Sequence, residues 1–200
     1  MNCKRIIQSL ENNRYKVSSF ETSTAAADYI AENVKGFTVG FGDSVTLATM
    51  NLAERLSEHN SVIDPANYTG LDFNKIAVKT LTTDVYITSV NAAAETGELV
   101  NIDGAGNRVA GSLYGHQKVY FVFGTNKIAP TLDKAIWRAR NIAAPQNAKR
   151  LGYKTPCAVK GDRCYECSSP NRICNTLNIY LKNMEDGAGE VIIIDENLGL

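Results

Sequence analysis

Four of the five cysteines of this chain lie in one short polar stretch. Cys157, Cys164, Cys167 and Cys174 follow the spacing C-x6-C-x2-C-x6-C. Thiolates are soft ligands that select zinc or iron–sulfur clusters, and a Cys-x2-Cys pair can place two sulfurs on one metal while two outer cysteines complete the set. Lysines and arginines crowd the same segment, and nearby cations lower the pKa of thiols. The pattern therefore predicts a metal site with these four cysteines as ligands.

Several states of these cysteines are compatible with the spacing. We favour an iron–sulfur cluster over structural zinc, because zinc ribbons usually carry two Cys-x2-Cys pairs and this chain has one. Disulfides would require a secreted protein, and we expect none because the residues after Met1 form no apolar signal region. Reduced thiols without a ligand are the remaining alternative. The expected location is the cytoplasm.

A glycine-rich loop that follows an apolar strand in the sequence is the second candidate site. Gly40, Gly42, Ser44 and Thr46 alternate along the loop, so the backbone can approach a ligand and two hydroxyls can donate to it. A helix follows, and its N-terminus would offer free N–H groups to an anion. The alternative is that Asp43 or Ser44 only caps this helix. The loop is neither a dinucleotide fingerprint nor a Walker loop.

Polar residues in three further segments complete the candidate site. Glu95 lies in a loop of small residues that follows a strand, and it is the candidate general base or carboxylate nucleophile. The alternative is that it is only solvated, as glutamates in loops more often are. Residues suited to contact an anion or substrate are Asn91, Asn107, Arg108 and Lys127. Lys127 follows a buried strand, where ligand crevices of α/β sheets lie. These residues predict a small anionic metabolite as the ligand.

The elements that would position these residues alternate between strands and helices. Apolar periodicity and caps predict helices over residues 1–13, 25–33, 45–56 and 131–143, the last ended near Pro145. Apolar runs predict strands at 15–20, 37–40, 62–63, 85–90, 119–123 and 190–195. Residues 99–102 and 108–110 flank a glycine-rich turn and predict a hairpin. The sheet is therefore expected to be mixed and mostly parallel, with flanking helices.

Length and charge place the chain among ordinary globular proteins. Its 200 residues fit one α/β domain spanning 1–200, with the cysteine-rich segment 149–178 as a small lobe within it. The 21 basic and 21 acidic residues balance, which argues against a nucleic-acid partner. No apolar run approaches the roughly 20 residues of a membrane span.

Several short runs together resemble the lactate-utilization (LUD) domain proteins. They are residues 100–110, 124–128, 144–151, 155–158, the pair Cys164 and Cys167, Arg172 to Cys174, and Leu198-Gly199, which cover nearly the whole chain. The resemblance implies a relative of the sugar-phosphate isomerase, ribose-5-phosphate isomerase and CoA-transferase fold. It also implies an accessory component of an iron–sulfur system that oxidises L-lactate to pyruvate, with other lactate-oxidation subunits as partners.

Two other functions stay open at this point. One is an autonomous enzyme acting on a small phosphorylated, carboxylated or CoA-linked substrate, gripped by the glycine loop and Lys127 while Glu95 reacts. The other is a non-catalytic binding module with a structural zinc site. The chain has neither a flavin nor a nicotinamide fingerprint, nor the tandem cysteine runs of ferredoxin-type subunits. Assembly as a homo-oligomer is compatible with all three.

Overall fold

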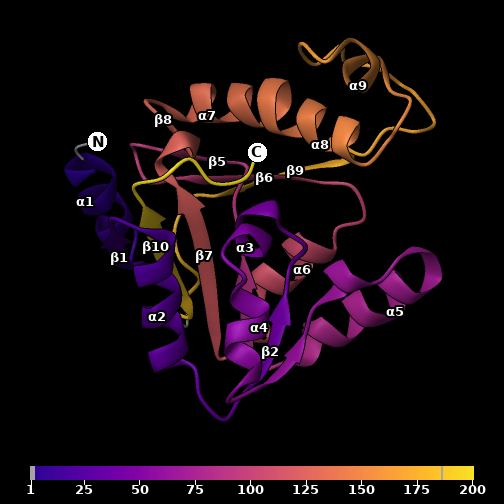
Figure 1. Ribbon diagram of the computed structural model, residues 1–200. Helices are drawn as coiled ribbons and strands as arrows, with labels where there is room; N and C mark the ends of the chain where they lie inside the picture. Colours follow the sequence, from indigo (N-terminus) through magenta and orange to yellow (C-terminus); the bar gives the residue numbers. More distant parts are fainter. Residues whose placement is uncertain (1–2, 186) are drawn as a thin grey trace.

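A six-stranded parallel sheet forms the centre of the computed structural model, which describes residues 3–185 and 187–200 (Figure 1). Its strand order is β1-β10-β7-β4-β2-β3, and every neighbouring pair is parallel. The strands are β1 (Lys16–Phe20), β2 (Thr38–Phe41), β3 (Ser61–Ile63), β4 (Val85–Thr88), β7 (Lys118–Gly124) and β10 (Gly189–Ile194). The central strands are buried on both faces, as their continuous apolar runs predict.

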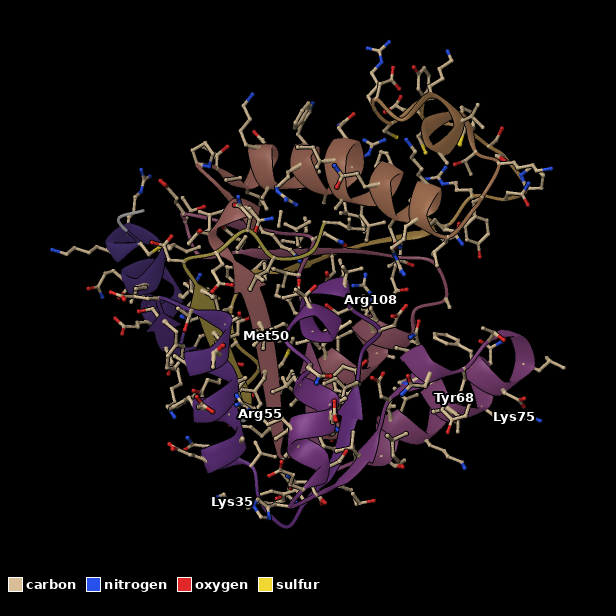
Figure 2. All side chains as sticks on the ribbon, in the orientation of Figure 1. Lys35, Met50, Arg55, Tyr68, Lys75 and Arg108 are labelled. Atoms are coloured by element: carbon tan, nitrogen blue, oxygen red, sulfur yellow. The ribbon has the colours of Figure 1, made fainter. Side chains whose placement is uncertain are left out.

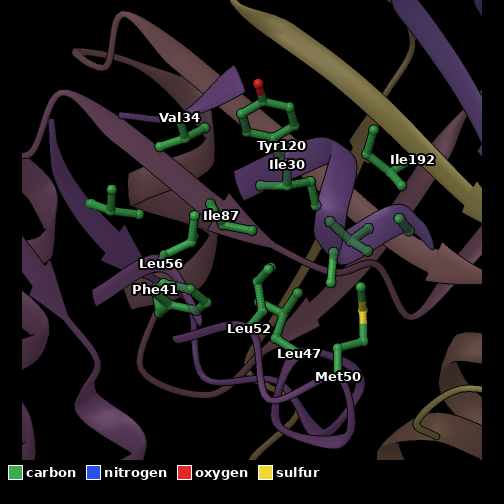
Figure 3. Packing of buried hydrophobic residues seen from close by; sticks show 14 of the residues in the cluster. Ile30, Val34, Phe41, Leu47, Met50, Leu52, Leu56, Ile87, Tyr120 and Ile192 are labelled. Carbon is green, nitrogen blue, oxygen red and sulfur yellow. The ribbon is translucent and has the colours of Figure 1, made fainter. Parts of the chain in front are cut away.

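Three helices cover one face of this sheet. They are α2 (Ser23–Asn33), α3 (Val45–Thr49) and α4 (Leu52–Ser57). Their apolar side chains pack against alternate residues of the strands, and Figure 3 shows Ile30, Leu47 and Leu52 meeting Ile87 and Ile192 in this cluster. Because successive strand residues point to opposite faces, the intervening residues are left for a second core.

The second core lies between the main sheet and a smaller, mixed sheet of order β8-β5-β6-β9. Its elements are β5 (Ala92–Ala94), β6 (Leu99–Asp103), β8 (Ile128–Ala129) and β9 (Thr176–Tyr180), with α1 (Lys4–Asn12) and α6 (Asn107–Leu113) alongside. The small sheet is covered on its outer side by a long helical rod made of α7 (Leu132–Arg138), the π-helical turn η4 (Ala139–Ala143) and α8 (Ala144–Arg150). Figure 1 shows this rod lying across the carboxyl ends of the main strands.

The remaining elements lie at the edges of the fold. They are the short turns η1 (Pro65–Asn67), η2 (Thr80–Thr82) and η3 (Thr125–Lys127), with helices α5 (Gly70–Lys79) and α9 (Pro156–Lys160). In Figure 1, α9 and its flanking loops project beyond α8. Among the described residues, no helix is long and apolar enough to cross a membrane. The prediction of an α/β fold with a mostly parallel sheet and flanking helices is confirmed.

The predicted hairpin at residues 99–110 is wrong. Residues 99–103 do form a strand, but its partners are β5 and β9, and residues 107–113 are helical. The reason is Asp103, whose carboxylate accepts hydrogen bonds from the backbone N–H groups of Gly106, Arg108 and Val109. Gly106 adopts a left-handed conformation (φ 85°) at the start of the helix. The glycine-rich turn therefore opens a helix.

Two helix boundaries also differ from the prediction. The helix expected to end near Pro145 continues to Arg150, because the π-helical turn η4 precedes the proline and Pro145 occupies the first turn of α8, where it needs no N–H donor. The helix expected over 45–56 is split at Asn51, which has a positive φ of 50°. Helix α5 was not predicted, since its exposed apolar residues give it no clear apolar face.

Candidate functional site

A cleft of about 480 Å³ lies at the carboxyl ends of the main strands. Its walls come from the loops that follow β2 and β4, the turn between β6 and α6, and the η3 turn after β7. Helix α8 and the loop from Pro170 to Asn175 close it from the other side. This is the position at which open α/β sheets bind ligands.

The fold brings six of the eight predicted anion-binding residues to this cleft. They are Ser44, Thr46, Asn91, Asn107, Arg108 and Lys127. They come from four separate loops, three after strands of the parallel sheet and one after β6 of the small sheet, which the fold brings together. Figure 2 labels Arg108 in the region between α8 and α3.

Three other predicted residues lie elsewhere. A side chain at Gly40 would collide with Thr80 and Thr83, so this glycine serves close packing. Gly42 packs against Tyr86 and Thr88 in the same way and lines a neighbouring cavity of about 630 Å³ between α4 and α5. Glu95 lies in the turn between β5 and β6, and its Oε2 is 3.2 Å from Arg5 Nη1. A catalytic role of Glu95 stays a prediction.

Lys127 is the most deeply buried cation of the cleft, with 4% of its surface exposed. Its Nζ donates to Thr46 Oγ1 at 2.9 Å, to Ser89 Oγ at 3.1 Å and to the carbonyl of Val90 at 3.1 Å. Burial, followed by the charges of Arg138 and Arg108, lowers the pKa of Lys127 to about 7. Sequence reasoning found Lys127 but missed Ser89, because a serine at a strand end carries no distinctive signal.

Two guanidinium groups flank this lysine. Arg108 donates from Nη2 to the carbonyl of Ile102 at 2.7 Å. Arg138 is buried and donates to the backbone oxygens of Asn126, Asn91 and Leu200 at 3.0, 2.6 and 3.3 Å. Sequence reasoning missed Arg138, although its spacing from Ala135, on the buried face of its helix, was an available signal.

Ser44 caps α3 rather than presenting a helix terminus to a ligand. Its Oγ accepts a hydrogen bond from the N–H of Leu47 at 3.4 Å. Helix α3 has five residues, and a helix of one turn has a small dipole. An anion in the cleft would therefore be bound mainly by side chains, and the capping alternative explains why Asp43-Ser44 precedes the helix.

The four clustered cysteines lie on α9 and the loop that follows it. All four are half-buried free thiols, and Figure 2 shows sulfur atoms gathered around α9. Cys164 Sγ accepts a hydrogen bond from the N–H of Glu166 at 3.4 Å, and Cys157 Sγ lies 3.3 Å from Thr155 Oγ1. Arg172 ties the loop together by donating to the carbonyls of Cys167 and Cys174, each at 3.0 Å.

The chemistry of this donor set fits a thiolate-bound metal. Four thiols, an N–H bond to one sulfur and a basic surrounding are features that stabilise thiolate ligands. The described residues, however, bring no three histidine, cysteine or acidic side chains together closely enough to hold an ion. The lobe shares residues with the cleft, because Arg172 and Ile173 line its wall.

The chain is similar to known proteins in sequence and in structure. A family model described as LUD domain matches residues 3–194. A DUF162 family protein from Deinococcus radiodurans is 11% identical, with 97% of this chain and 99% of that chain covered at a TM-score of 0.52. Ribose 5-phosphate isomerase A from Neisseria gonorrhoeae is 16% identical over 56% and 57% of the two chains, TM-score 0.37. The isomerase from Plasmodium falciparum is 14% identical over 54% and 52%, TM-score 0.34. Among curated proteins, none matches the chain.

Proposed function

The chain belongs to the LUD domain family of lactate-utilization-type proteins, and from this premise we propose that its cleft binds a small anionic metabolite of the carboxylate or phosphate class. One observation carries the proposal. Arg108 and Lys127 line the cleft, the buried Arg138 lies near Lys127, and no aspartate or glutamate of the described residues forms an ion pair with any of the three.

Unpaired cations in such a position are costly. A buried charge without a counter-ion loses its hydration, and carbonyls and hydroxyls replace only part of it. A bound anion would supply the missing negative charge. Arg150 and Arg172 extend the positive lining toward the mouth of the cleft, whereas Asp43 and Asp103 are its acidic residues and Asp103 is engaged by three backbone N–H groups.

Ligand titration tests this proposal. Isothermal titration with L-lactate, pyruvate and inorganic phosphate should detect binding of at least one of them, and added salt should weaken it. Arg108→Ala should reduce the affinity roughly tenfold or more, because a charge-assisted hydrogen bond is lost.

Arg163→Ala, an exposed arginine of the cysteine lobe outside the cleft, is the matched control and should bind as the wild type does. Circular dichroism checks that both variants are folded. Equal affinities of the wild type and the Arg108 variant would refute the proposal that the cleft binds the anion.

A second proposal concerns the cysteine lobe. We infer that Cys157, Cys164, Cys167 and Cys174 hold an iron–sulfur cluster. We further infer that the protein is an accessory component of a cytoplasmic system that oxidises L-lactate to pyruvate, and that it contacts other subunits of this system. The free thiols and their basic surroundings support this role. A bound cluster would supply one-electron transfer, whereas zinc, the alternative, would only organise the lobe.

Metal analysis separates these alternatives. Anaerobically purified protein should contain iron and acid-labile sulfide in stoichiometric amounts and absorb visible light. Cys164→Ser should lose both, and Cys3→Ser, outside the lobe, should keep them. Zinc without sulfide would mean that the lobe is structural and that the protein is a binding module or an autonomous enzyme. Absence of any metal would overturn the proposed metal site.

A further inference from the structure

The amine of Lys127 sits among groups that suit a neutral amine as well as a charged one. Its three partners are two hydroxyls, from Thr46 and Ser89, and the carbonyl of Val90. A hydroxyl both donates and accepts hydrogen bonds. A neutral amine can therefore donate to the carbonyl and to one hydroxyl while its lone pair accepts a hydrogen bond from the other hydroxyl. A lysine that serves only as a cation is instead usually paired with a carboxylate.

The surrounding charges also favour the neutral form. Burial is the largest cause of the lowered pKa of Lys127, and the guanidinium groups of Arg138 and Arg108 add to it. With a pKa of about 7, a large fraction of the amine carries a free electron pair near neutral pH. A desolvated lysine next to other cations is the arrangement in which an amine becomes a nucleophile.

The cleft provides a place for the anionic end of a substrate beside this amine. Arg108 lines the cleft and uses one guanidinium N–H for the carbonyl of Ile102, so its other donors can meet a carboxylate. The hydroxyl of Ser44 and the amide of Asn107 line the same space. A small carbonyl acid held by Arg108 would present its carbonyl toward the interior, where Lys127 lies.

The C-terminal segment packs closely against Lys127. A Cβ atom at Gly199 would lie 3.2 Å from Lys127 Nζ and would collide with the hydroxyl of Thr46. A glycine here therefore lets the segment pass close to the amine, while Lys127 still lines the cleft. The φ of +68° at Gly199 is also one that other residues rarely adopt.

We propose that Lys127 is a nucleophilic residue that forms an imine with a carbonyl-bearing acid of the 2-oxo acid class. This rests on the proposed binding of a small anion in the cleft. The amine nitrogen attacks the carbonyl carbon and forms a C–N bond. The carbonyl oxygen takes up both amine protons and leaves as water, so no oxidation or reduction occurs in the step.

Reductive trapping tests the imine. The full-length protein is incubated with pyruvate and treated with sodium borohydride, which reduces the C=N bond, and its intact mass is measured. One adduct with the mass of pyruvate less one oxygen atom is expected, and peptide mapping should place it on Lys127. L-Lactate has a hydroxyl in place of the ketone group of pyruvate and should give no adduct.

Two variants make the test specific. Lys127→Met keeps the length of the side chain without the amine and should lose the adduct. Lys134→Met removes an exposed lysine of α7 and should keep it. An adduct spread over surface lysines, or one that persists in Lys127→Met, would overturn the proposal.

The failure of this inference can be told apart from the failure of the binding proposal. If pyruvate or lactate binds in the titration but no adduct is trapped on Lys127, the cleft binds anions and the lysine does not react. If phosphate binds but pyruvate and lactate do not, the cleft binds anions and the imine proposal falls alone. If none of the three binds, both proposals fall together.

Discussion

The buried amine of Lys127 makes the stability of the protein depend on pH in a direction that can be calculated. The pKa of this lysine is lowered from 10.5 to about 7 in the folded protein. The unfolded chain therefore binds the proton more tightly than the folded chain between these two values. The free energy of unfolding must rise with pH across this window, since stability rises wherever the unfolded state binds more protons.

The size of the effect follows from the shift. Each unit of pKa corresponds to about 1.4 kcal/mol, so at about pH 7 the protonated amine costs roughly 4 kcal/mol relative to an unperturbed lysine. At about pH 9 the same linkage leaves a cost of roughly 2 kcal/mol. The cost is fully present below the folded pKa and disappears as the pH rises toward the unfolded value. Lys127 should thus contribute a gain of about 2 kcal/mol between about pH 7 and pH 9.

Urea denaturation of matched variants measures this gain. Other groups also titrate in this window, so the quantity to measure is the difference in unfolding free energy between the wild type and Lys127→Met. This difference should change by about 2 kcal/mol in favour of the wild type as the pH rises from about 7 to about 9. The unfolding free energy of Lys134→Met should instead change with pH in the same way as that of the wild type. Parallel curves for Lys127→Met and the wild type would refute the lowered pKa.

Three further predictions concern groups around the cleft and the sheet. Gly199→Ala should destabilise the fold by more than about 1 kcal/mol in urea denaturation, because alanine is strained at a φ of +68° and its Cβ would collide with the hydroxyl of Thr46. Asp103→Ala should cost roughly 2 kcal/mol in urea denaturation, because three backbone N–H groups at the start of α6 lose their acceptor. Replacing Asp133, an exposed residue of α7, by alanine should cost less. Glu190 has a fully buried side chain, 2.8 Å from Lys118 and 3.2 Å from Lys16, and although burial raises its pKa, hydrogen bonds from Lys118 and Tyr29 lower it overall. The ionised carboxylate of Glu190 stabilises the fold at neutral pH, and this stabilisation is lost as the pH falls through the lowered pKa. Glu190→Gln should therefore lower the free energy of unfolding by about 3 kcal/mol at neutral pH and by progressively less in acid.

The main sheet could be predicted from the sequence because its strands are continuous apolar runs. Residues 119–123 and 190–195 show this pattern, and both runs form central strands. The segment around Asp103 could not be read in the same way. Its Asp-Gly-x-Gly pattern fits both a hairpin turn and a helix start, and the outcome depends on tertiary pairing of β6 with β5 and β9.

The cleft was partly predictable for a related reason. Polar residues placed just behind apolar strands, such as Asn91 and Lys127, must gather at one edge of a parallel sheet. Arg138, which lies near Lys127 but does not line the cleft, comes from a helix and is held by contacts with backbone oxygens that only the folded chain brings near. Gly40 and Gly42 look like ligand-binding glycines in sequence, but their neighbours in the core could not be known from it.

The π-helical turn Ala139–Ala143 sets which side of α8 faces the cleft. A π turn contains one residue more than the α-helical turn that it replaces. Deleting that residue would restore α-helical geometry and leave α8 facing the cleft much as before, because the extra residue is contained within one turn. Deleting a residue from α7 without changing the π turn would instead rotate α7 and α8 by about 100° relative to each other. Asn147 and Arg150 would then leave the cleft wall, and the loop carrying Arg172 would be displaced with them. A π turn is thus a way by which chains with this fold can gain one residue in the rod while the cleft side chains stay in place.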